Sequence, residues 1–200
     1  MAPSGGRRVG VVVLAAGRGS RFGDASPKTL APLGGQPLVA HAVTQAKASG
    51  LRPVVVVVGC QAEDVALAAG RDVEVIENPF WEEGMSTSLR AGLAAVLADR
   101  SVTAMTVALA DQPRIGSEAY RRLVLAHADG AELAVATYGG KRGHPVLIGR
   151  SWFEEAMRMT GDQGARTLLT RPEVIEVPCD GTGEATDVDT PADLKALEGN

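Results

Sequence analysis

The strongest constraint on the fold is a regular alternation of short apolar runs with segments of helical periodicity. Residues 9–14 (VGVVVL) and 53–58 (PVVVVV) are continuous apolar runs rich in β-branched residues, a pattern typical of strands buried on both faces. Further strands are expected at 73–77 and 103–109, and helices at 37–49, 62–69, 86–98 and 117–128. This order predicts an α/β fold in which helices cover a mostly parallel sheet.

The later part of the chain departs from that alternation. Residues 133–138 and 145–148 are expected to be strands joined by a turn at Gly139-Gly140, which predicts a hairpin. Ser151-x-x-Glu154 and Thr190-x-x-Asp193 match an N-capping signature and predict two more helices. Because no repeat or linker interrupts the chain, we expect one domain over residues 9–198 after a flexible tail over residues 1–8.

Charge and cysteine usage exclude several classes of protein. The chain has 20 Lys and Arg against 24 Asp and Glu, a net charge of −4, so the basic excess of a nucleic-acid binder is missing. The apolar runs are far shorter than the ~20 residues of a membrane span, and the first residues lack the apolar stretch of a signal peptide. Cys60 and Cys179 form no CxxC pair, so neither a zinc ribbon nor a disulfide framework is supported. We expect a cytoplasmic protein with no nucleic-acid or membrane partner.

A loop rich in glycine and arginine follows the first expected strand. Residues 14–23 read LAAGRGSRFG, and Lys28 comes shortly afterwards. Glycines let the backbone curl so that its N–H groups point at phosphate oxygens, and Arg18, Arg21 and Lys28 add positive charge beside them. The loop therefore predicts a phosphate site. The alternative is a solvated surface turn, and in either case we expect Lys28 to be an exposed charge that contributes little to stability.

Two familiar phosphate-binding motifs do not match this loop. The dinucleotide fingerprint G-x-G-x-x-G has Phe22 where its third glycine belongs, and the second expected strand ends in Gly59-Cys60-Gln61, with no carboxylate for a ribose. A Walker A loop needs a glycine directly before its lysine, and Pro27 stands there. The pattern disfavours both NAD and P-loop chemistry.

Three aspartates are candidates for a metal site. Asp111 follows the strand at 103–109, at the sheet edge where ligands gather in parallel sheets, and Asp187 and Asp189 lie near the last expected helix. Mg²⁺ prefers one or two carboxylates together with phosphate oxygens and waters. Asp111 with Asp189 would supply that pair, with Asp187 in reserve. The alternatives are a turn-forming role for Asp111 and a helix-terminus role for the other two.

The first loop resembles the signature of the MobA-like nucleotidyltransferases, L-A-[AG]-G-x-[GS]-x-R-[MF]-G followed by K-x-L. The resemblance extends to about Leu197 through five further segments: residues 78–93 (NPFWEEGMSTSLRAGL), 110–113 (ADQP), 142–145 (RGHP), 161–166 (GDQGAR) and 187–191 (DVDTP). Ala16 and the Asp187/Asp189 pair are similar to the molybdenum cofactor cytidylyltransferase branch, which is called MocA. Pro27 and Ala110 depart from the usual pattern.

The resemblance implies a single-domain, three-layer αβα Rossmann-like nucleotidyltransferase fold with a small β-hairpin insertion. It implies a Mg²⁺-dependent enzyme that transfers CMP from CTP to the phosphate of molybdopterin and releases pyrophosphate. Lys28, Arg18 and Asp111 would be catalytic, and Asp111 and Asp189 would hold the metal. The nucleotide would be bound by Leu14, Ala15, Ala16, Gly17, Arg18, Gly19, Ser20, Arg21, Lys28, Ser86 and Ser88. The acceptor would be bound by Gln112, His144, Asp162 and Arg166.

Several alternatives stay open. The acceptor is another phosphorylated small molecule such as a sugar phosphate, or the protein is an NAD(P)H-dependent oxidoreductase on the same scaffold, similar to a nicotine blue reductase. A non-catalytic chaperone that binds molybdoenzyme apoproteins is the last alternative. Ser86 and Ser88 have an ordinary explanation as residues that open a helix, and His41 and His127 are expected to be structural.

Overall fold

The computed structural model describes residues 8–22 and 26–199. Within them, a seven-stranded sheet has the order β5-β4-β1-β6-β8-β7-β9. Its strands are β1 (Arg8–Ala15), β4 (Val54–Val58), β5 (Glu74–Glu77), β6 (Val102–Leu109), β7 (Leu133–Tyr138), β8 (Lys141–Gly149) and β9 (Ile175–Pro178). Strand β8 pairs antiparallel with β6 and β7, and the other pairs are parallel. The predicted mostly parallel sheet is confirmed.

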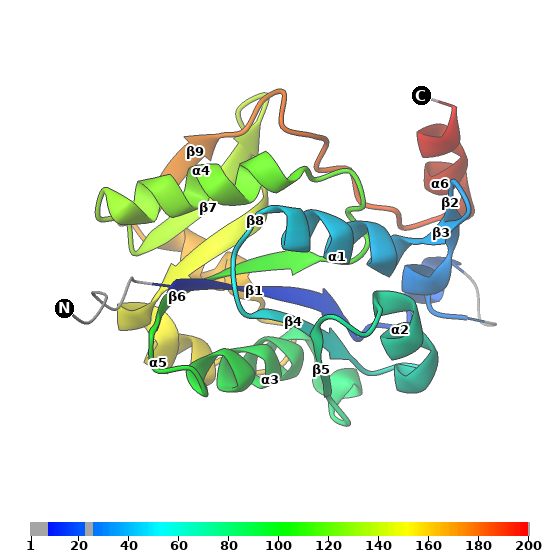
Figure 1. The fold of residues 1–200 in the computed structure, drawn as a ribbon, viewed down its shortest axis with the longest axis horizontal. Coiled ribbons are helices and arrows are strands. Elements are labelled where there is room, and N and C mark those ends of the chain that lie inside the picture. The colour runs from blue at the N-terminus through cyan, green and yellow to red at the C-terminus, as the bar shows by residue number, and fades with distance from the viewer. Residues whose placement is uncertain (1–7, 23–25, 200) are drawn as a thin grey trace.

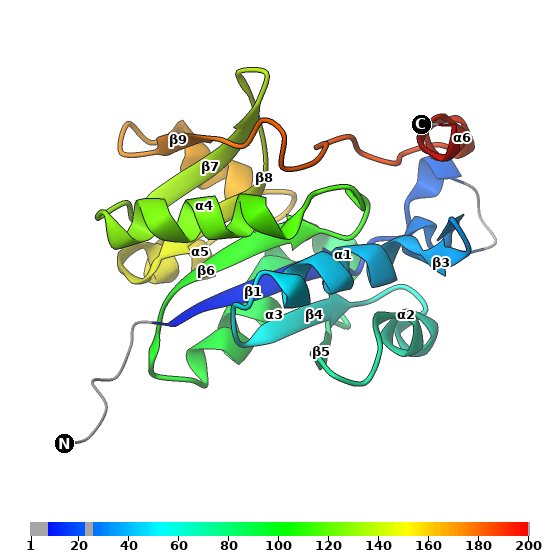
Figure 2. The same ribbon diagram turned by 45° about the horizontal axis from the view of Figure 1, so that its top comes forward.

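Helices cover both faces of the sheet, as Figures 1 and 2 show. Helices α1 (Leu38–Ala48), α2 (Ala62–Ala69) and α4 (Ser117–Ala128) pack on one face. Helices α3 (Met85–Leu97) and α5 (Phe153–Met157) pack on the other. The short antiparallel hairpin of β2 (Pro32–Leu33) and β3 (Gln36–Pro37) lies against α6 (Pro191–Glu198) at the end of the molecule where the C-terminus lies. The predicted three-layer α/β fold is therefore confirmed.

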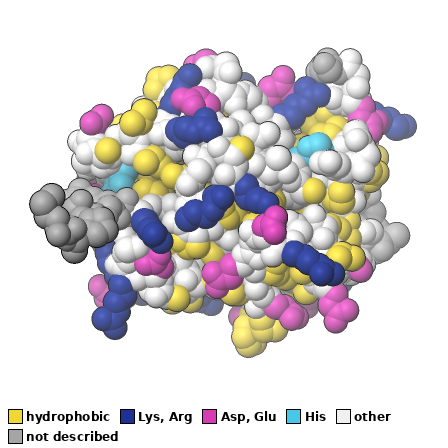
Figure 3. Space-filling view, viewed as in Figure 1, with side chains coloured by type: hydrophobic (Ala, Val, Ile, Leu, Met, Phe, Trp, Pro, Cys, Tyr) yellow, Lys and Arg dark blue, Asp and Glu magenta, His cyan; other side chains and the backbone are white. Residues whose placement is uncertain are grey.

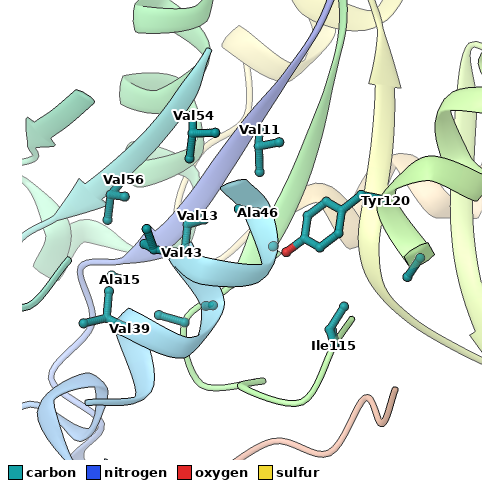
Figure 4. Packing of buried hydrophobic residues seen from close by; sticks show 14 of the residues in the cluster. Val11, Val13, Ala15, Val39, Val43, Ala46, Val54, Val56, Ile115 and Tyr120 are labelled. Atoms are coloured by element: carbon teal, nitrogen blue, oxygen red, sulfur yellow. The ribbon is translucent and has the colours of Figure 1, made fainter. Parts of the chain in front are cut away.

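The core explains why the strands read as continuous apolar runs. Successive residues of β1 point to opposite faces, so Val11 and Val13 pack under α1 while Val12 and Leu14 pack under α3. Val11, Val12 and Val13 are fully buried. Figure 4 shows how the valines of β1 and β4 meet α1 and how the Tyr120 ring of α4 closes the same cluster. On the face seen in Figure 3, cationic and anionic side chains are interspersed.

Two features near the end of the sheet differ from expectation. The short strand β9 was not predicted, and it pairs with β7 alone. The proposed cap at Ser151 is wrong: α5 begins at Phe153, and the Ser151 hydroxyl donates to Glu132 at 2.6 Å instead. The capping box at Thr190 and Asp193 is confirmed at the start of α6. The expected tail lies almost entirely outside the described residues. None of the described helices is long and apolar enough to cross a membrane.

Candidate active site

Lys28 lies between two carboxylates that come from distant parts of the chain. Its Nζ atom is 2.5 Å from Asp111 Oδ2 and 2.7 Å from Asp189 Oδ1. The side chains of Lys28, Asp111 and Asp189 are 14%, 17% and 30% exposed. The expectation that Lys28 is an exposed loop charge is therefore wrong, because both partners remove it from solvent. We refer to these three residues as the lysine–aspartate cluster.

Local backbone geometry brings Lys28 to this position. A short 3-10 helix, Lys28–Leu30, follows the first loop, and the Lys28 N–H donates to the Arg18 carbonyl at 3.2 Å. The Lys28 side chain then passes directly over Gly19, where a Cβ atom would lie 2.6 Å from Lys28 Cγ. Gly19 also has a φ of +71°, in the left-handed region that favours glycine. The glycine thus makes room for the lysine that crosses the loop.

The late segment, residues 179–190, brings Asp189 to Asp111. It runs from β9 back along the carboxyl end of the sheet to α6 (Figure 2), and the Val188 N–H donates to the Asp111 carbonyl at 2.9 Å. Asp187 and Asp189 then diverge. Asp187 accepts from the Gln112 side-chain amide at 2.6 Å, whereas Asp189 contacts Lys28 and also Arg21, at 3.1 Å. The expected proximity of Asp111 and Asp189 is therefore observed.

The charged groups of the cluster influence one another. Burial by itself would lower the pKa of Lys28, but the attraction and hydrogen bonds of Asp111 and Asp189 outweigh it, so the pKa of the ammonium is raised. The hydrogen bond from Lys28 lowers the pKa of Asp189, despite some desolvation. Burial raises the pKa of Asp111 against the pull of Lys28. Asp111 is thus the carboxylate that most needs positive charge beside it.

The donors near the cluster fit a hard divalent cation with few protein ligands. Asp111 Oδ1 is buried and has no hydrogen-bond partner among the described residues, so Lys28 does not satisfy this carboxylate completely. The described chain holds no group of three or more His, Cys, Asp and Glu side chains arranged for a metal. Two carboxylates with substrate phosphates and waters are an arrangement typical of Mg²⁺. A metal held by Asp111 and Asp189 therefore agrees with the residues present.

A cavity of about 420 Å³ opens beside the cluster. We call Leu14, Arg21, Lys28, Asp111, Asp187 and Asp189, which line this cavity, the nucleotide wall, after the role that the sequence leads us to expect for that side. His144, Asp162 and Arg166 also line the cavity, and we call them the acceptor wall for the same reason. The structure thus brings the expected metal and acceptor residues to one cavity, and Gln112 reaches the same place through its bond to Asp187.

The acceptor wall contains neutral polar groups without partners. His144 is 4% exposed, and burial followed by repulsion from Arg166 lowers its pKa to about 4. The imidazole is therefore neutral near pH 7. Within the described chain, His144 Nδ1 and Gln112 Oε1 are both buried without a hydrogen-bond partner. Unpaired buried polar atoms are costly, so His144 Nδ1, which belongs to a residue that lines the cavity, is a candidate to hydrogen bond to a ligand.

The other residues of the first loop are distributed differently from the expected catalytic group. The Arg18 guanidinium lies 5.7 Å from the centre of the Trp81 ring, whereas the carboxylates of the cluster pair with Lys28 and Arg21. Gly17 and Ser20 are exposed, and Ala15 and Ala16 are buried where the loop leaves β1. The Ala16 carbonyl accepts from the Cys60 N–H at 2.9 Å. Arg18 therefore lies on the first loop but is not among the residues that line the cavity, and it is separate from the cluster.

The segment of residues 78–88 joins the two walls, and sequence reasoning assigned no role to most of it. Asn78 is buried, and its side-chain Nδ2 donates to the Thr87 and Ser88 hydroxyls at 2.8 and 3.0 Å, while its side-chain Oδ1 accepts from the Phe80 N–H. Ser88 is thus engaged with Asn78, and the N-cap position of α3 is Gly84. Within the described residues the Ser86 hydroxyl has no partner, but its N–H donates to the Gly161 carbonyl at 3.1 Å.

Gly84 explains why this segment meets the acceptor side so closely. It has a φ of +116°, and a Cβ atom there would collide with the Gly161 backbone. The available signal in the sequence was the N-P-x-W order at residues 78–81, which belongs to the segment that resembles the nucleotidyltransferase family. His41 and His127 hydrogen bond to the carbonyls of Leu33 and Ala131, in agreement with their expected structural roles.

Comparisons with known proteins agree with this geometry. The MobA-like NTP transferase domain matches residues 11–176. Nicotine blue oxidoreductase from Paenarthrobacter nicotinovorans is 33% identical over 190 residues, which are 90% of this chain and 91% of that protein. The bifunctional protein GlmU from Kineococcus radiotolerans is 37% identical over 142 residues, 70% of this chain, and the match spans only 28% of GlmU.

A solved structure covers nearly the whole chain. Rv0371c from Mycobacterium tuberculosis H37Rv superposes with a TM-score of 0.83 and 32% identity, over 97% of this chain and 98% of that one. A second structure of Rv0371c is a complex with manganese, with a TM-score of 0.78 and 30% identity over 96% and 99% of the two chains. The likeness therefore includes the late segment, which lies beyond the part matched by the family domain.

Proposed function

Since the chain belongs to the family of MobA-like NTP transferases, we propose that it is a Mg²⁺-dependent enzyme that transfers CMP from CTP to the phosphate of molybdopterin. The observation that carries this proposal is the lysine–aspartate cluster beside a glycine- and arginine-rich loop at the carboxyl ends of β1 and β6. Ligands of open α/β sheets gather at that edge. We also propose that the reaction takes place in the cytoplasm.

Asp111 and Asp189 would hold the metal, with Asp187 in reserve. The unpartnered Asp111 Oδ1 and the manganese complex of Rv0371c support this assignment. The divalent ion would neutralise negative charge on the triphosphate. The backbone N–H groups of residues 15–21, with Lys28, Arg18 and Arg21, would bind and orient the phosphate oxygens.

The acceptor wall would place the second substrate. Arg166 supplies the positive charge for a phosphate, while neutral His144 and Gln112 supply hydrogen bonds to polar groups of the acceptor. An oxygen of the acceptor phosphate attacks the α-phosphorus of CTP, and the bond from that phosphorus to the β-phosphate oxygen breaks, so that pyrophosphate leaves. The attacking oxygen is already anionic, hence no general base is needed. The rate acceleration comes from the positioning of the two substrates and from the stabilisation of negative charge on the phosphates.

The test is a pyrophosphate-release assay with Mg²⁺, molybdopterin and each of the four nucleoside triphosphates in turn. We expect release with CTP to exceed that with ATP, GTP and UTP, and to require the acceptor. The Asp111→Asn variant serves as the matched inactive control. The assay is repeated with a sugar phosphate in place of molybdopterin. If a triphosphate other than CTP gives the most release, that triphosphate is the nucleotide substrate. If release occurs only with the sugar phosphate, the acceptor is a sugar phosphate and not molybdopterin. No release under any of these conditions would reject the transferase.

A second candidate is an oxidoreductase, because nicotine blue oxidoreductase is 33% identical over nearly its whole length. Against it, the first loop has Phe22 in place of a third glycine, and β4 leads into Gly59-Cys60-Gln61 without a carboxylate for a ribose. Equilibrium binding separates the two candidates. We expect CTP with Mg²⁺ to bind more tightly than NADPH, and micromolar NADPH binding with substrate reduction would favour the oxidoreductase.

A further inference from the structure

We infer that Lys28 keeps free divalent cations off Asp111 and Asp189, so that a metal ion is accepted only together with a nucleoside triphosphate. The inference rests on the proposed function, because it takes these two aspartates as the residues that hold the metal. It gives Lys28 a second role beside the binding of phosphate oxygens. In the substrate-free protein, Lys28 is itself the cation that occupies the acidic pair.

The ammonium and a metal ion need the same space. Lys28 Nζ lies 2.5 Å from an Asp111 oxygen and 2.7 Å from an Asp189 oxygen. A metal that binds both oxygens at about 2.1 Å from each would lie where the ammonium is. A metal can bridge these two oxygens only after the lysine has left them, and Asp111 Oδ1, which has no partner among the described residues, is then a further ligand atom.

Free metal competes with this lysine at a disadvantage. The ammonium is tethered to the backbone by its own side chain, and a tethered ligand acts at an effective concentration in the millimolar range or above. The apparent metal affinity is reduced by the fraction of time for which the lysine is away from the pair. A second cation adds to the competition, because Arg21 lies 3.1 Å from the other oxygen of Asp189.

A triphosphate removes this disadvantage. Lys28 and Arg21 both come from the loop that is proposed to cradle the phosphates, and Lys28 crosses that loop directly over Gly19. Phosphate oxygens offer both cations new partners, while the metal offers the two carboxylates a new partner. Every charge is then paired before and after the exchange. Metal and nucleotide thus strengthen each other's binding by the same factor.

The competing explanation is a purely structural ion cluster. In that case Lys28 stays on both carboxylates when substrates bind, and the metal is held by phosphate oxygens elsewhere in the cavity. Replacing Lys28 would then leave the affinity for free metal unchanged. The two explanations therefore differ in a measurement that needs neither nucleotide nor turnover.

The experiment is calorimetric titration of the full chain with Mn²⁺ alone. We expect Lys28→Met to bind Mn²⁺ at least tenfold more tightly than the unmodified protein, and Lys28→Met combined with Asp111→Asn to lose that gain. Lys47→Met is the matched control, because Lys47 also pairs with a carboxylate, Asp72 at 3.0 Å, but on the surface away from the cavity. It should bind Mn²⁺ as the unmodified protein does.

Folding of each variant is checked by circular dichroism and thermal melting, and Lys28→Gln serves as the second variant if the methionine disturbs the fold. The inference is overturned if a folded Lys28 variant binds Mn²⁺ no more tightly than the unmodified protein, or if the gain survives the loss of Asp111. These outcomes are separate from those of the transfer assay. If the unmodified protein transfers no nucleotide but Lys28→Met binds Mn²⁺ more tightly than it does, the proposed function is overturned and this inference is supported.

Discussion

The two walls of the cavity are built in different ways. On the nucleotide wall, Lys28, Arg21, Asp111 and Asp189 form ion pairs whose partners belong to separate segments of the chain. On the acceptor wall, His144 is neutral and buried, one of its ring nitrogens has no partner among the described residues, and Asp162 and Arg166 line the cavity beside it. Charges can exchange partners when a charged ligand arrives, whereas a buried neutral group recognises a ligand only where it stands. The difference predicts that Lys28 and Arg21 change partners when a ligand binds and that His144 keeps its place.

The largest effect is expected from substitutions in the nucleotide wall. Lys28→Ala and Asp111→Asn should each lower the transfer rate on the order of 10²–10³-fold, because each removes a group that stabilises charge in the transition state. Lys28→Ala should also lower the free energy of unfolding by roughly 1–3 kcal/mol, between the values for exposed and buried ion pairs. Steady-state kinetics and urea unfolding measure these effects.

Lys47→Ala is the control for this pair of measurements, because its ion pair with Asp72 is exposed. It should change neither the rate nor, beyond about 0.5 kcal/mol, the free energy of unfolding. Full activity of Lys28→Ala would show that the cluster has no catalytic role.

The second prediction concerns the neutral acceptor wall. The pKa of His144 falls from 6.5 to about 4 on folding, so the unfolded chain binds more protons between these values. The contribution of His144 to the free energy of unfolding is therefore fully present above pH 6.5. This contribution falls by up to about 3 kcal/mol as the pH falls towards 4. His144→Gln should flatten this part of the profile, measured by urea unfolding at a series of pH values. An unchanged slope in His144→Gln would contradict the assignment.

The third prediction decides to which wall Asp187 belongs. Its carboxylate accepts from Gln112, whereas Asp189 contacts Lys28 and Arg21. We expect Asp187→Asn to cost about tenfold in transfer, or about 1.4 kcal/mol, mainly as a raised KM for the acceptor. Asp189→Asn should cost more and should combine with Asp111→Asn less than additively, because both act on one ion. A larger loss at Asp187 would exchange the two assignments.

The smallest effect is expected at the edge of the nucleotide wall. The Trp81 ring contacts the Arg18 guanidinium, an interaction of roughly 0.5–1 kcal/mol at exposed sites. Trp81→Leu should therefore raise the KM for the nucleotide a few-fold and leave kcat nearly unchanged. Trp152→Leu is the matched control, since Arg171 lies over the Trp152 ring at 5.9 Å outside the cavity. Equal changes in both variants would argue against a role for Trp81.

The sequence could predict the nucleotide wall much better than the acceptor wall. Strands β1 and β6 are parallel neighbours, so the rule that ligands gather at carboxyl ends located the first loop and Asp111 correctly. His144 reaches the same edge from the beginning of β8, which runs antiparallel to β6. A rule based on strand ends cannot find such a residue, and only the family resemblance indicated it.

Other features depend on contacts that no local pattern encodes. Lys28 and Asp189 are 161 residues apart, so their pairing and the burial of Lys28 follow from tertiary structure. Strand β9 has four residues, of which Ile175, Glu176 and Pro178 are exposed, so it lacks the alternation that marks a longer strand. The Ser151 hydroxyl donates to Glu132, and this tertiary contact outweighs the local preference of serine for a cap position.

The late segment also separates the residues that form the fold from those that complete the candidate site. All seven strands of the sheet precede residue 179, so the sheet can pair its strands without Asp187 and Asp189. The Val188 N–H donates to the Asp111 carbonyl and the Gly116 N–H donates to the Thr182 carbonyl, which fastens the segment across the sheet. We therefore expect that a chain without these contacts keeps its sheet but no longer brings Asp189 to Lys28.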